Sequence, residues 1–412
     1  MESYTIILVI LALMIIFSGI AEKIKLPVPI MLIVVGLALG FFSTGKSIEL
    51  NPKIVMMVFL PPLLYDAAFN IDFKQFRTHL NTIGQLAVGL VFLTTAGIAV
   101  AAHYLIPGMS WPLAFVLGAI LSATDAVAAI GITKGLKLPH SVFAILEGES
   151  LLNDASALVA YRFAVAVVGG ATFVWWQASL QFLIVLAGGV LVGMLMTWLL
   201  AFALRIFRTN NMVIICFMLL MPFVAYALAE HFGVSGVIAV VILGLGMSRL
   251  SRTKFPDYLK QQSKNFWDVT IFLLNGLIFV LMGLQFPLVL KQMNVAQIGT
   301  YLFYAFVITL IAFGIRLIRV YWQQLSLRKA FEGNRKVRES SLIDSKTSLI
   351  ITWSGMRGIV SLAMAMGLPM LSNNQAFPFR NEIIFLSIAV VLISLIGQGI
   401  TLPFIAKAVN KK

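Results

Sequence analysis

The chain has 412 residues, of which 60% are hydrophobic and only 11% are charged, and its formal net charge is +14. A soluble protein carries about 25% charged residues, so this composition excludes an ordinary soluble domain. Apolar runs of about 20 residues, the length that crosses a bilayer as a helix, recur from end to end. The short alternating segments of an outer-membrane barrel are absent, and the single cysteine excludes an intrachain disulfide.

The apolar runs predict an all-α polytopic membrane protein with about 13 transmembrane helices. The first run has no basic residues before it and is followed by Glu22, Lys23 and Lys25, so it is predicted to span the membrane rather than to be a cleaved signal peptide. In chain order, the predicted segments lie at about 5–21, 27–43, 53–70, 80–105, 112–133, 141–168, 178–204, 211–230, 233–248, 266–290, 298–325, 347–370 and 382–406.

The basic residues predict the orientation of these helices. With the N-terminus outside and the C-terminus in the cytoplasm, the cytoplasmic loops hold most of the 30 Lys and Arg residues. The opposite loops hold only Lys46, Lys53, Lys291 and Arg380. This alternation follows the positive-inside rule, so the positive charge indicates contact with membrane lipids and not with nucleic acid. The longest hydrophilic segment, 328–346, is predicted to be a cytoplasmic loop of a single transmembrane domain, residues 1–412, without a soluble domain.

Acidic residues inside the predicted helices point to function, because an ionisable group in the membrane is costly. The sixth segment contains Glu147-Gly-Glu-Ser-Leu-Leu-Asn-Asp154. Helical spacing places Ser150 and Asp154 on one stripe, and Glu149 and Asn153 on the stripe beside it. Carboxylate, hydroxyl and amide oxygens together suit a hard monovalent cation. The alternative is an acid neutralised by a basic neighbour that holds helices together, and it fits Glu149 better than Asp154.

The fifth segment carries a second polar pair, Thr124-Asp125, about midway along an apolar run. Ser122, Thr124 and Gly131 favour local unwinding, which would expose backbone carbonyls to a cation. The fifth and sixth segments are antiparallel neighbours, so Asp125 and Asp154 are expected at similar depth. Together the two segments predict a site for a hard monovalent cation near Asp125 and Asp154, with no resident cofactor.

Buried carboxylates need compensating cations, and two arginine positions are candidates. Arg319, with Arg316 one turn away, lies in the eleventh segment, and we expect it to pair with Glu149. The alternative, an arginine that reaches the membrane surface, applies better to Arg316 and Arg319 than to Arg357. Glycines on both sides of Arg357, in Gly355-Met-Arg-Gly358, predict a second broken helix.

Other acidic residues permit more than one interpretation. Two prolines in Phe59-Leu-Pro-Pro-Leu-Leu-Tyr-Asp66 are expected to bend the third helix, and Asp66 either lines an ion path or makes a structural pair. Asp268 follows a hydrophilic helix start and is expected near the membrane interface.

Six motifs follow one another along the chain, from Phe59–Asp66 to Gln398–Pro403. In residues and order they resemble the cation:proton antiporter superfamily, in the branch of sodium/hydrogen exchangers and NhaP-type prokaryotic relatives. The motif Gly148-Glu-Ser-Leu-Leu-Asn-Asp154 is highly specific, whereas the others would be weaker alone. The matching segments span almost the whole chain: Phe59–Asp66, Ala123–Asp125, Gly148–Asp154, Ala229–Gly236, Gly355–Gly358 and Gln398–Pro403.

The resemblance implies 13 helices, inverted repeats, crossing broken fifth and twelfth helices, and a homodimer with an elevator-like motion. It implies cation contact at Thr124, Asp125, Ser150 and Asp154. The residues it implies as supports are Asn153, Glu149 and Arg319, with Arg357 at the second break. Asn-Asp at positions 153–154, instead of two acids, resembles the electroneutral branch. Two departures are Ala126, where many exchangers have proline, and the chain end at Lys412, where many relatives carry a regulatory tail.

These observations favour a secondary antiporter that exchanges a monovalent cation for H⁺, with both ions competing for Asp154. One titrating carboxylate predicts one proton per cation. Na⁺ is expected, while Li⁺ and K⁺ stay open, and a K⁺/H⁺ antiporter of the same fold is the alternative. A cation channel would need a filter-like repeat, which is absent. An intramembrane enzyme would need a serine–base pair or a metal motif, and only Ser150 near Glu149 comes close. The expected location is a bacterial inner membrane.

Overall fold

The computed structural model describes residues 3–24, 26–42, 52–71, 73–133, 140–170, 175–207, 211–291, 293, 295–333, 342–369, 371–372 and 375–410. The described chain is helical, apart from a two-stranded antiparallel pairing of β1 (Leu371–Ser372) with β2 (Gln375–Ala376). Lys25 and Lys46 of the predicted loops lie outside the described residues.

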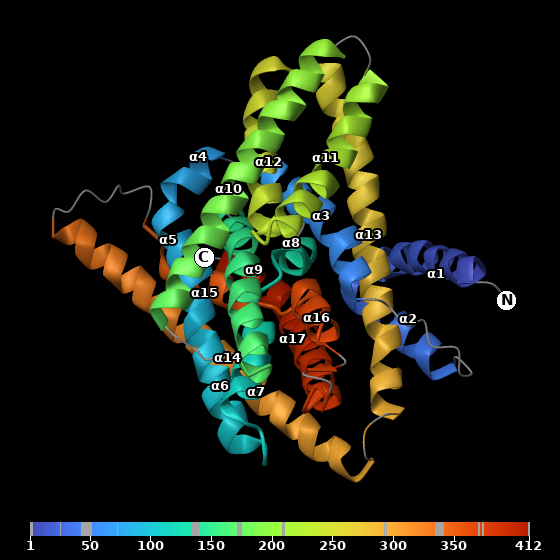
Figure 1. The fold of residues 1–412 in the computed structure, drawn as a ribbon, viewed down its shortest axis with the longest axis vertical. Helices are drawn as coiled ribbons and strands as arrows, with labels where there is room; N and C mark the ends of the chain where they lie inside the picture. Colours follow the sequence, from blue (N-terminus) through green and yellow to red (C-terminus); the bar gives the residue numbers. More distant parts are fainter. Residues whose placement is uncertain are drawn as a thin grey trace. The chain divides into compact units, whose positions relative to one another are not determined.

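The helices follow one another along the chain (Figure 1). They are α1 (Ser3–Lys23), α2 (Val28–Phe42), α3 (Pro52–Asn70), α4 (Phe73–Thr78), α5 (Leu80–Gly84), the π-helical η1 (Gln85–Leu90), α6 (Val91–Leu105), α7 (Trp111–Ser122), α8 (Ala126–Thr133), α9 (His140–Val168), α10 (Trp175–Ile206), α11 (Asn211–His231), α12 (Gly236–Lys254), α13 (Asp257–Lys291), α14 (Val295–Glu332), α15 (Ser345–Trp353), α16 (Ile359–Met366) and α17 (Arg380–Asn410).

Long apolar helices confirm a protein that crosses the membrane several times. In the described part of the chain, eight helices are long and apolar enough to span a bilayer, and α2 and α7 are shorter apolar helices. The total of 13 spans stays a prediction. So does the single transmembrane domain.

Several helix ends differ from the sequence-based prediction. The third segment is a continuous helix, α3, that contains both Pro61 and Pro62. The predicted loop 328–346 is shorter, because α14 continues to Glu332 and α15 begins at Ser345. Residues 334–341 of that loop lie outside the described residues. Polar residues continue these helices beyond the apolar runs, so the loop predicted from hydropathy alone is longer than the observed one.

The chain divides into two compact units, which are described separately. The first comprises residues 1–49, 74–171 and 276–412, and the second comprises residues 50–73 and 172–275. In the first unit α7 packs on α6 and α9, while α17 packs on α14 and α16. In the second unit α12 packs on α3, α10 and α11.

Two helices of the first unit are interrupted, as the sequence predicts. The first break, residues 123–125, separates α7 from α8, and the second, residues 354–358, separates α15 from α16. The breaks meet, because the Asp125 backbone N–H donates to the Met356 carbonyl at 2.8 Å. The Ser361 hydroxyl also donates to the Ala123 carbonyl at 3.3 Å. Backbone groups released by unwinding therefore bond across from one broken helix to the other.

Glycines let α10 and α12 approach closely in the second unit. A Cβ atom added at Gly193 would lie 2.6 Å from the Ala239 carbonyl oxygen and 2.7 Å from the Ile242 Cβ. Gly188 and Gly189 are similarly crowded by the segment at the start of α12. Small residues at a helix interface allow this packing inside a membrane.

We expect Gly193→Val to destabilise the protein by about 1–3 kcal/mol, because the new side chain overlaps α12 backbone. The matched control is Gly314→Val on α14, where an added Cβ meets nothing within 4 Å. The measurement is the thermal midpoint of the purified protein, followed by size-exclusion chromatography after heating. Equal midpoints for the two variants would contradict the tight interface.

Candidate functional site

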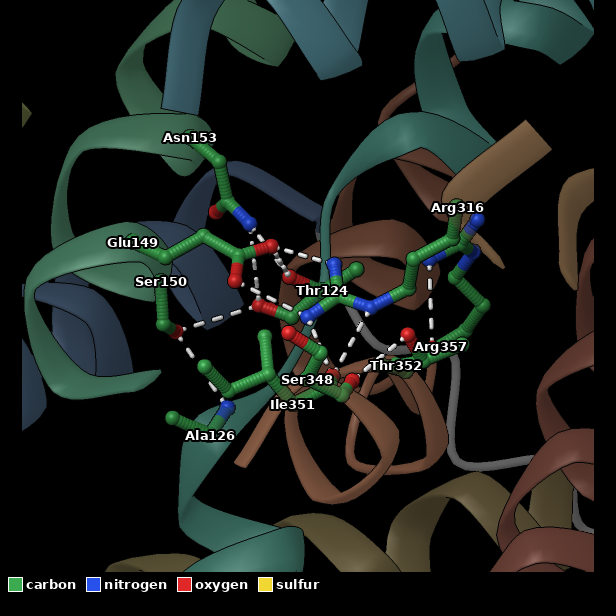
Figure 2. Close-up of polar contacts among 11 residues, drawn as sticks. Thr124, Ala126, Glu149, Ser150, Asn153, Arg316, Ser348, Ile351, Thr352 and Arg357 are labelled. Atoms are coloured by element: carbon green, nitrogen blue, oxygen red, sulfur yellow. Dashed lines mark hydrogen bonds and ion pairs between the residues drawn. The ribbon is translucent and has the colours of Figure 1, made fainter. Parts of the chain in front are cut away.

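The predicted site residues come together inside the first unit, where α9 passes the first break. Helix α9 supplies Glu149, Ser150 and Asn153, while the break supplies Thr124 (Figure 2). Asp154 belongs to the same helix. Glu149 and Asn153 are each 1% exposed, and Asp154 is 5% exposed. The spacing of i and i+4 on α9 therefore brings the polar residues to one buried region, as the sequence predicts.

Side chains of α9 hold the first break in its extended form. The Ser150 hydroxyl donates to the Thr124 carbonyl at 3.1 Å and accepts from the Ala126 N–H at 3.3 Å. The Asn153 amide donates to the Thr124 hydroxyl, which in turn donates to a Glu149 carboxylate oxygen at 3.3 Å. These bonds replace helical bonds that the break gives up, so the unwound backbone keeps its partners.

Glu149 is neutralised by Arg316, which corrects the predicted pairing with Arg319. The Arg316 Nη2 atom lies 2.8 Å from Glu149 Oε2, and Nη1 bonds the other carboxylate oxygen. The same guanidinium donates to the Ile351 carbonyl on α15 at 2.9 Å and 3.1 Å. Arg316 is 2% exposed, so it does not reach the membrane surface, contrary to that alternative for this residue.

Arg319 has different partners. Its guanidinium donates to Gln85 Oε1 in η1 at 2.8 Å and to Gln323 Oε1 at 3.4 Å. The two arginines are three residues apart, and apolar residues flank both at helical spacing, so the sequence does not reveal which one faces Glu149. The rotation of α14 about its axis determines which of the two arginines faces Glu149.

Arg357 lies at the second break, as predicted, and is buried. Its backbone N–H donates to the Ser394 hydroxyl at 3.1 Å, and Nη1 donates to the Gly355 carbonyl at 3.3 Å. Its Nε atom has no hydrogen-bond partner among the described residues. The charges of Arg316 and Glu149 both act on this guanidinium. Arg357 therefore adds a second buried positive charge to the site.

Asp125 joins the two broken helices through its carboxylate. One oxygen accepts from the Ala128 N–H at 3.4 Å, and the other accepts from the Ile359 N–H at 3.4 Å. Each donor belongs to the first turn of a half-helix, α8 or α16, whose positive dipole end stabilises a negative charge. A side chain at Gly358 would collide with this carboxylate, so only glycine fits there.

Asp154 sits beside this arrangement with an available acceptor. The charges of Asp125 and Asp154 act on each other. Asp154 Oδ1 and Asn153 Oδ1 are buried and have no hydrogen-bond partner among the described residues. Both are oxygen atoms, which are ligands for a hard cation. Within the described residues there is no group of three or more His, Cys, Asp or Glu that could hold a metal ion.

The structure thus brings together Thr124, Asp125, Glu149, Ser150, Asn153 and Asp154, with Arg357 at the second break. Their roles in ion binding stay predictions, and Arg319 is not in contact with Glu149. Ser394 and the Met356 carbonyl are contacts that the sequence did not single out, and the sequence named Arg316 only as the neighbour of Arg319.

We expect Arg316→Gln to destabilise the protein by about 3–5 kcal/mol, because it leaves the Glu149 charge buried without a partner. The matched control Arg319→Gln should cost about 1 kcal/mol, since it loses hydrogen bonds to neutral amides. Thermal midpoints of the purified proteins measure both effects. The double variant Glu149→Gln/Arg316→Gln should recover part of the loss, and no recovery would contradict a paired charge.

Comparison with known proteins identifies a family for this chain. The family described as "Sodium/hydrogen exchanger, transmembrane" matches residues 8–408. The chain is 32% identical to an uncharacterised Na⁺/H⁺ exchanger, YjcE, of Escherichia coli, covering 98% of this chain and 76% of that protein. It is 34% identical to a sodium, potassium, lithium and rubidium/H⁺ antiporter of Bacillus pumilus, of which it spans 62%. It is 31% identical to the Na⁺/H⁺ antiporter NhaH of Halobacillus aidingensis, of which it covers 96%.

A solved structure shares the fold. The sodium proton antiporter MjNhaP1 from Methanocaldococcus jannaschii matches with a TM-score of 0.75 and 22% identity, covering 99% of this chain and 98% of that one. The chain therefore shares the overall fold of that antiporter. Because the family matches residues 8–408, almost the whole of this chain, the chain is a member of the sodium/hydrogen exchanger family of transmembrane proteins.

Proposed function

We propose that this protein is a secondary antiporter that exchanges Na⁺ for H⁺, with both ions competing for Asp154. The observation that carries the proposal is the contrast between two neighbouring acids. Glu149 is held by Arg316, while Asp154 Oδ1 is buried and has no partner among the described residues. A carboxylate of this kind can take either a proton or a cation. The family and the names of the antiporter relatives support the same reading.

The buried charges favour one ion at a time. Arg316 and Arg357 contribute two positive charges, while Asp125, Glu149 and Asp154 contribute three negative charges when all are ionised. The cluster then has one net negative charge, and a charge in a low-dielectric site is costly. One Na⁺ or one H⁺ neutralises it, whereas two would leave a positive excess. We infer electroneutral exchange of one proton for one cation.

The surrounding oxygens define the proposed ion shell. Asp154 supplies the charged oxygen, and Asn153 supplies an amide oxygen. Hydroxyls of Thr124 and Ser150 are held by the hydrogen bonds described above and retain one lone pair each. Asp125 completes the negative field while it holds the two half-helices together. Glu149, Arg316 and Arg357 fix positions and charge and do not take the ion.

The setting of the transporter follows from sequence and family. We propose a bacterial plasma membrane with the N-terminus outside and the C-terminus in the cytoplasm, because the basic loops alternate. A homodimer is proposed with it, on the family resemblance. Na⁺ and H⁺ are cargo, no resident cofactor is assigned, and the activity is transport and not enzymatic catalysis. Since one relative is named for Na⁺, K⁺, Li⁺ and Rb⁺, the same site is proposed to accept other alkali ions more weakly.

Asp154→Asn should abolish exchange, because an amide can neither release a proton nor balance a cation. The assay uses proteoliposomes with a pH-sensitive dye, in which an imposed Na⁺ gradient moves protons. The matched control is Asp257→Asn, at an exposed acid that pairs with Lys260 on the surface. Exchange that persists in Asp154→Asn would contradict the assignment of Asp154 as the group for which Na⁺ and H⁺ compete. A rate that depends strongly on a valinomycin clamp of the membrane potential would overturn electroneutrality.

Competition predicts that the KM for Na⁺ rises as the pH falls, while the rate at saturating Na⁺ changes little. The acidic limit is about tenfold in KM per pH unit, because one bound proton excludes one cation. Initial rates across a panel of Na⁺, Li⁺, K⁺ and Rb⁺ concentrations at several pH values test this. A fall in the saturated rate at constant KM would instead indicate a proton site separate from the cation site.

A further inference from the structure

A polar pocket lies in the second unit, outside the proposed ion site. It has a volume of about 220 Å³ and is formed by the C-terminal part of α3, the end of α12 and the first turns of α13. Its lining includes two acids, Asp66 and Asp268, and three bases. The bases are Arg252, Lys260 and Lys264. An excess of bases over acids disfavours a plain cation site.

The bases are positioned to bind an anion. The Arg252 guanidinium donates to the Ile71 carbonyl at 2.9 Å, which orients it while other N–H groups stay available. Lys260 pairs with Asp257 at 3.2 Å, so part of its charge is used outside the pocket. Arg252 and Lys264 are then the main source of positive potential.

The buried side of the pocket also contains a hydrogen-bond donor that an acceptor on a ligand would satisfy. Trp267 lines it, is 2% exposed, and its indole N–H has no hydrogen-bond partner among the described residues. An indole N–H only donates, so a ligand that satisfies it must present an acceptor oxygen. The ring is held against Tyr65, with centroids 5.0 Å apart. Ser248 and Ser251 add buried hydroxyls to the same lining.

The two carboxylates in the pocket favour a ligand that also carries a positively charged group. Asp66 is oriented by Asn70, whose amide donates to it at 2.8 Å, and Asp268 lies at the exposed side. A bare phosphate would be repelled by them. A phosphate joined to a primary ammonium satisfies both charges, because the ammonium can donate hydrogen bonds to the carboxylates.

The course of α13 indicates a lipid as the source of this group. Lys264, Asp268 and Phe272 lie at i, i+4 and i+8, so they share one stripe of the helix. Phe272 is 42% exposed and neighbouring Val269 is 59% exposed, so the stripe passes from charged to apolar toward the membrane interior. Charges at the surface followed by exposed apolar side chains match a headgroup followed by acyl chains.

We propose that this pocket binds the phosphoethanolamine headgroup of a phosphatidylethanolamine lipid, with the phosphate against Arg252, Lys264 and the Trp267 N–H and the ammonium against Asp66 and Asp268. The site is separate from the ion-binding residues and does not rest on the proposed function.

Native mass spectrometry of the full-length, delipidated protein tests this with phosphatidylethanolamine, phosphatidylglycerol and phosphatidylcholine. Phosphatidylethanolamine should bind best, because glycerol lacks the positive charge and choline cannot donate hydrogen bonds. Lys264→Gln should weaken binding of phosphatidylethanolamine about fivefold, the effect of one basic residue near a phosphate surface. The control Lys291→Gln, at the other end of α13, should leave it unchanged.

Asp268→Asn tests the contact with the ammonium group of the lipid separately from the contact with its phosphate. It should lower the ratio of bound phosphatidylethanolamine to bound phosphatidylglycerol, whereas Glu332→Gln, at an exposed acid elsewhere, should not. The ratio is measured within one variant, so partial misfolding does not mimic the result. Equal binding of the three lipids, or equal effects of Lys264→Gln and Lys291→Gln, would overturn the proposal. Soluble glycerophosphoethanolamine that binds as tightly as the lipid would overturn a lipid as the occupant.

Discussion

The ion pair between Glu149 and Arg316 is the constraint on which the rest of the first unit depends. It joins α9 to α14, and through the Ile351 carbonyl it also reaches α15. Two parallel hydrogen bonds fix the planar groups against each other, so the rotation of both helices is set. Since either partner alone would leave a charge buried without compensation, both must be present in the folded protein. In the proposed mechanism, the pair also keeps Glu149 from binding cargo and leaves Asp154 as the acid that takes the proton or the cation.

Around that pair, the two broken helices stabilise each other. Unwinding frees backbone groups that lipid cannot satisfy, and this chain satisfies them with Ser150, Ser394 and the opposite break. Ala126 matters here, because proline in its place would have no N–H to donate to Ser150. The departure from the common family pattern is therefore accompanied by a specific hydrogen bond.

Much of this arrangement could be predicted from the sequence, because the acids, the glycines beside Arg357 and the spacing on α9 are local signals. The choice between Arg316 and Arg319 could not, since it depends on how α14 is rotated in the packed protein. The π-helical turn η1 was also missed, because nothing in residues 85–90 indicates a wider turn, which depends on tertiary packing. The ends of α13 and α14 were placed too far inside, since polar residues continue a helix beyond the apolar run as readily as they end it.

The carboxylate of Asp125 accepts from the first turns of α8 and α16 at once. Any ion that changes the charge near Asp125 changes the strength of both contacts together. If the proposed site binds an ion, its occupancy and the mutual placement of the two half-helices would be coupled, and each would shift the other by the same free energy. Bound cargo would then change the contact between α8 and α16 directly, and no separate sensor would be needed to report that the site is occupied.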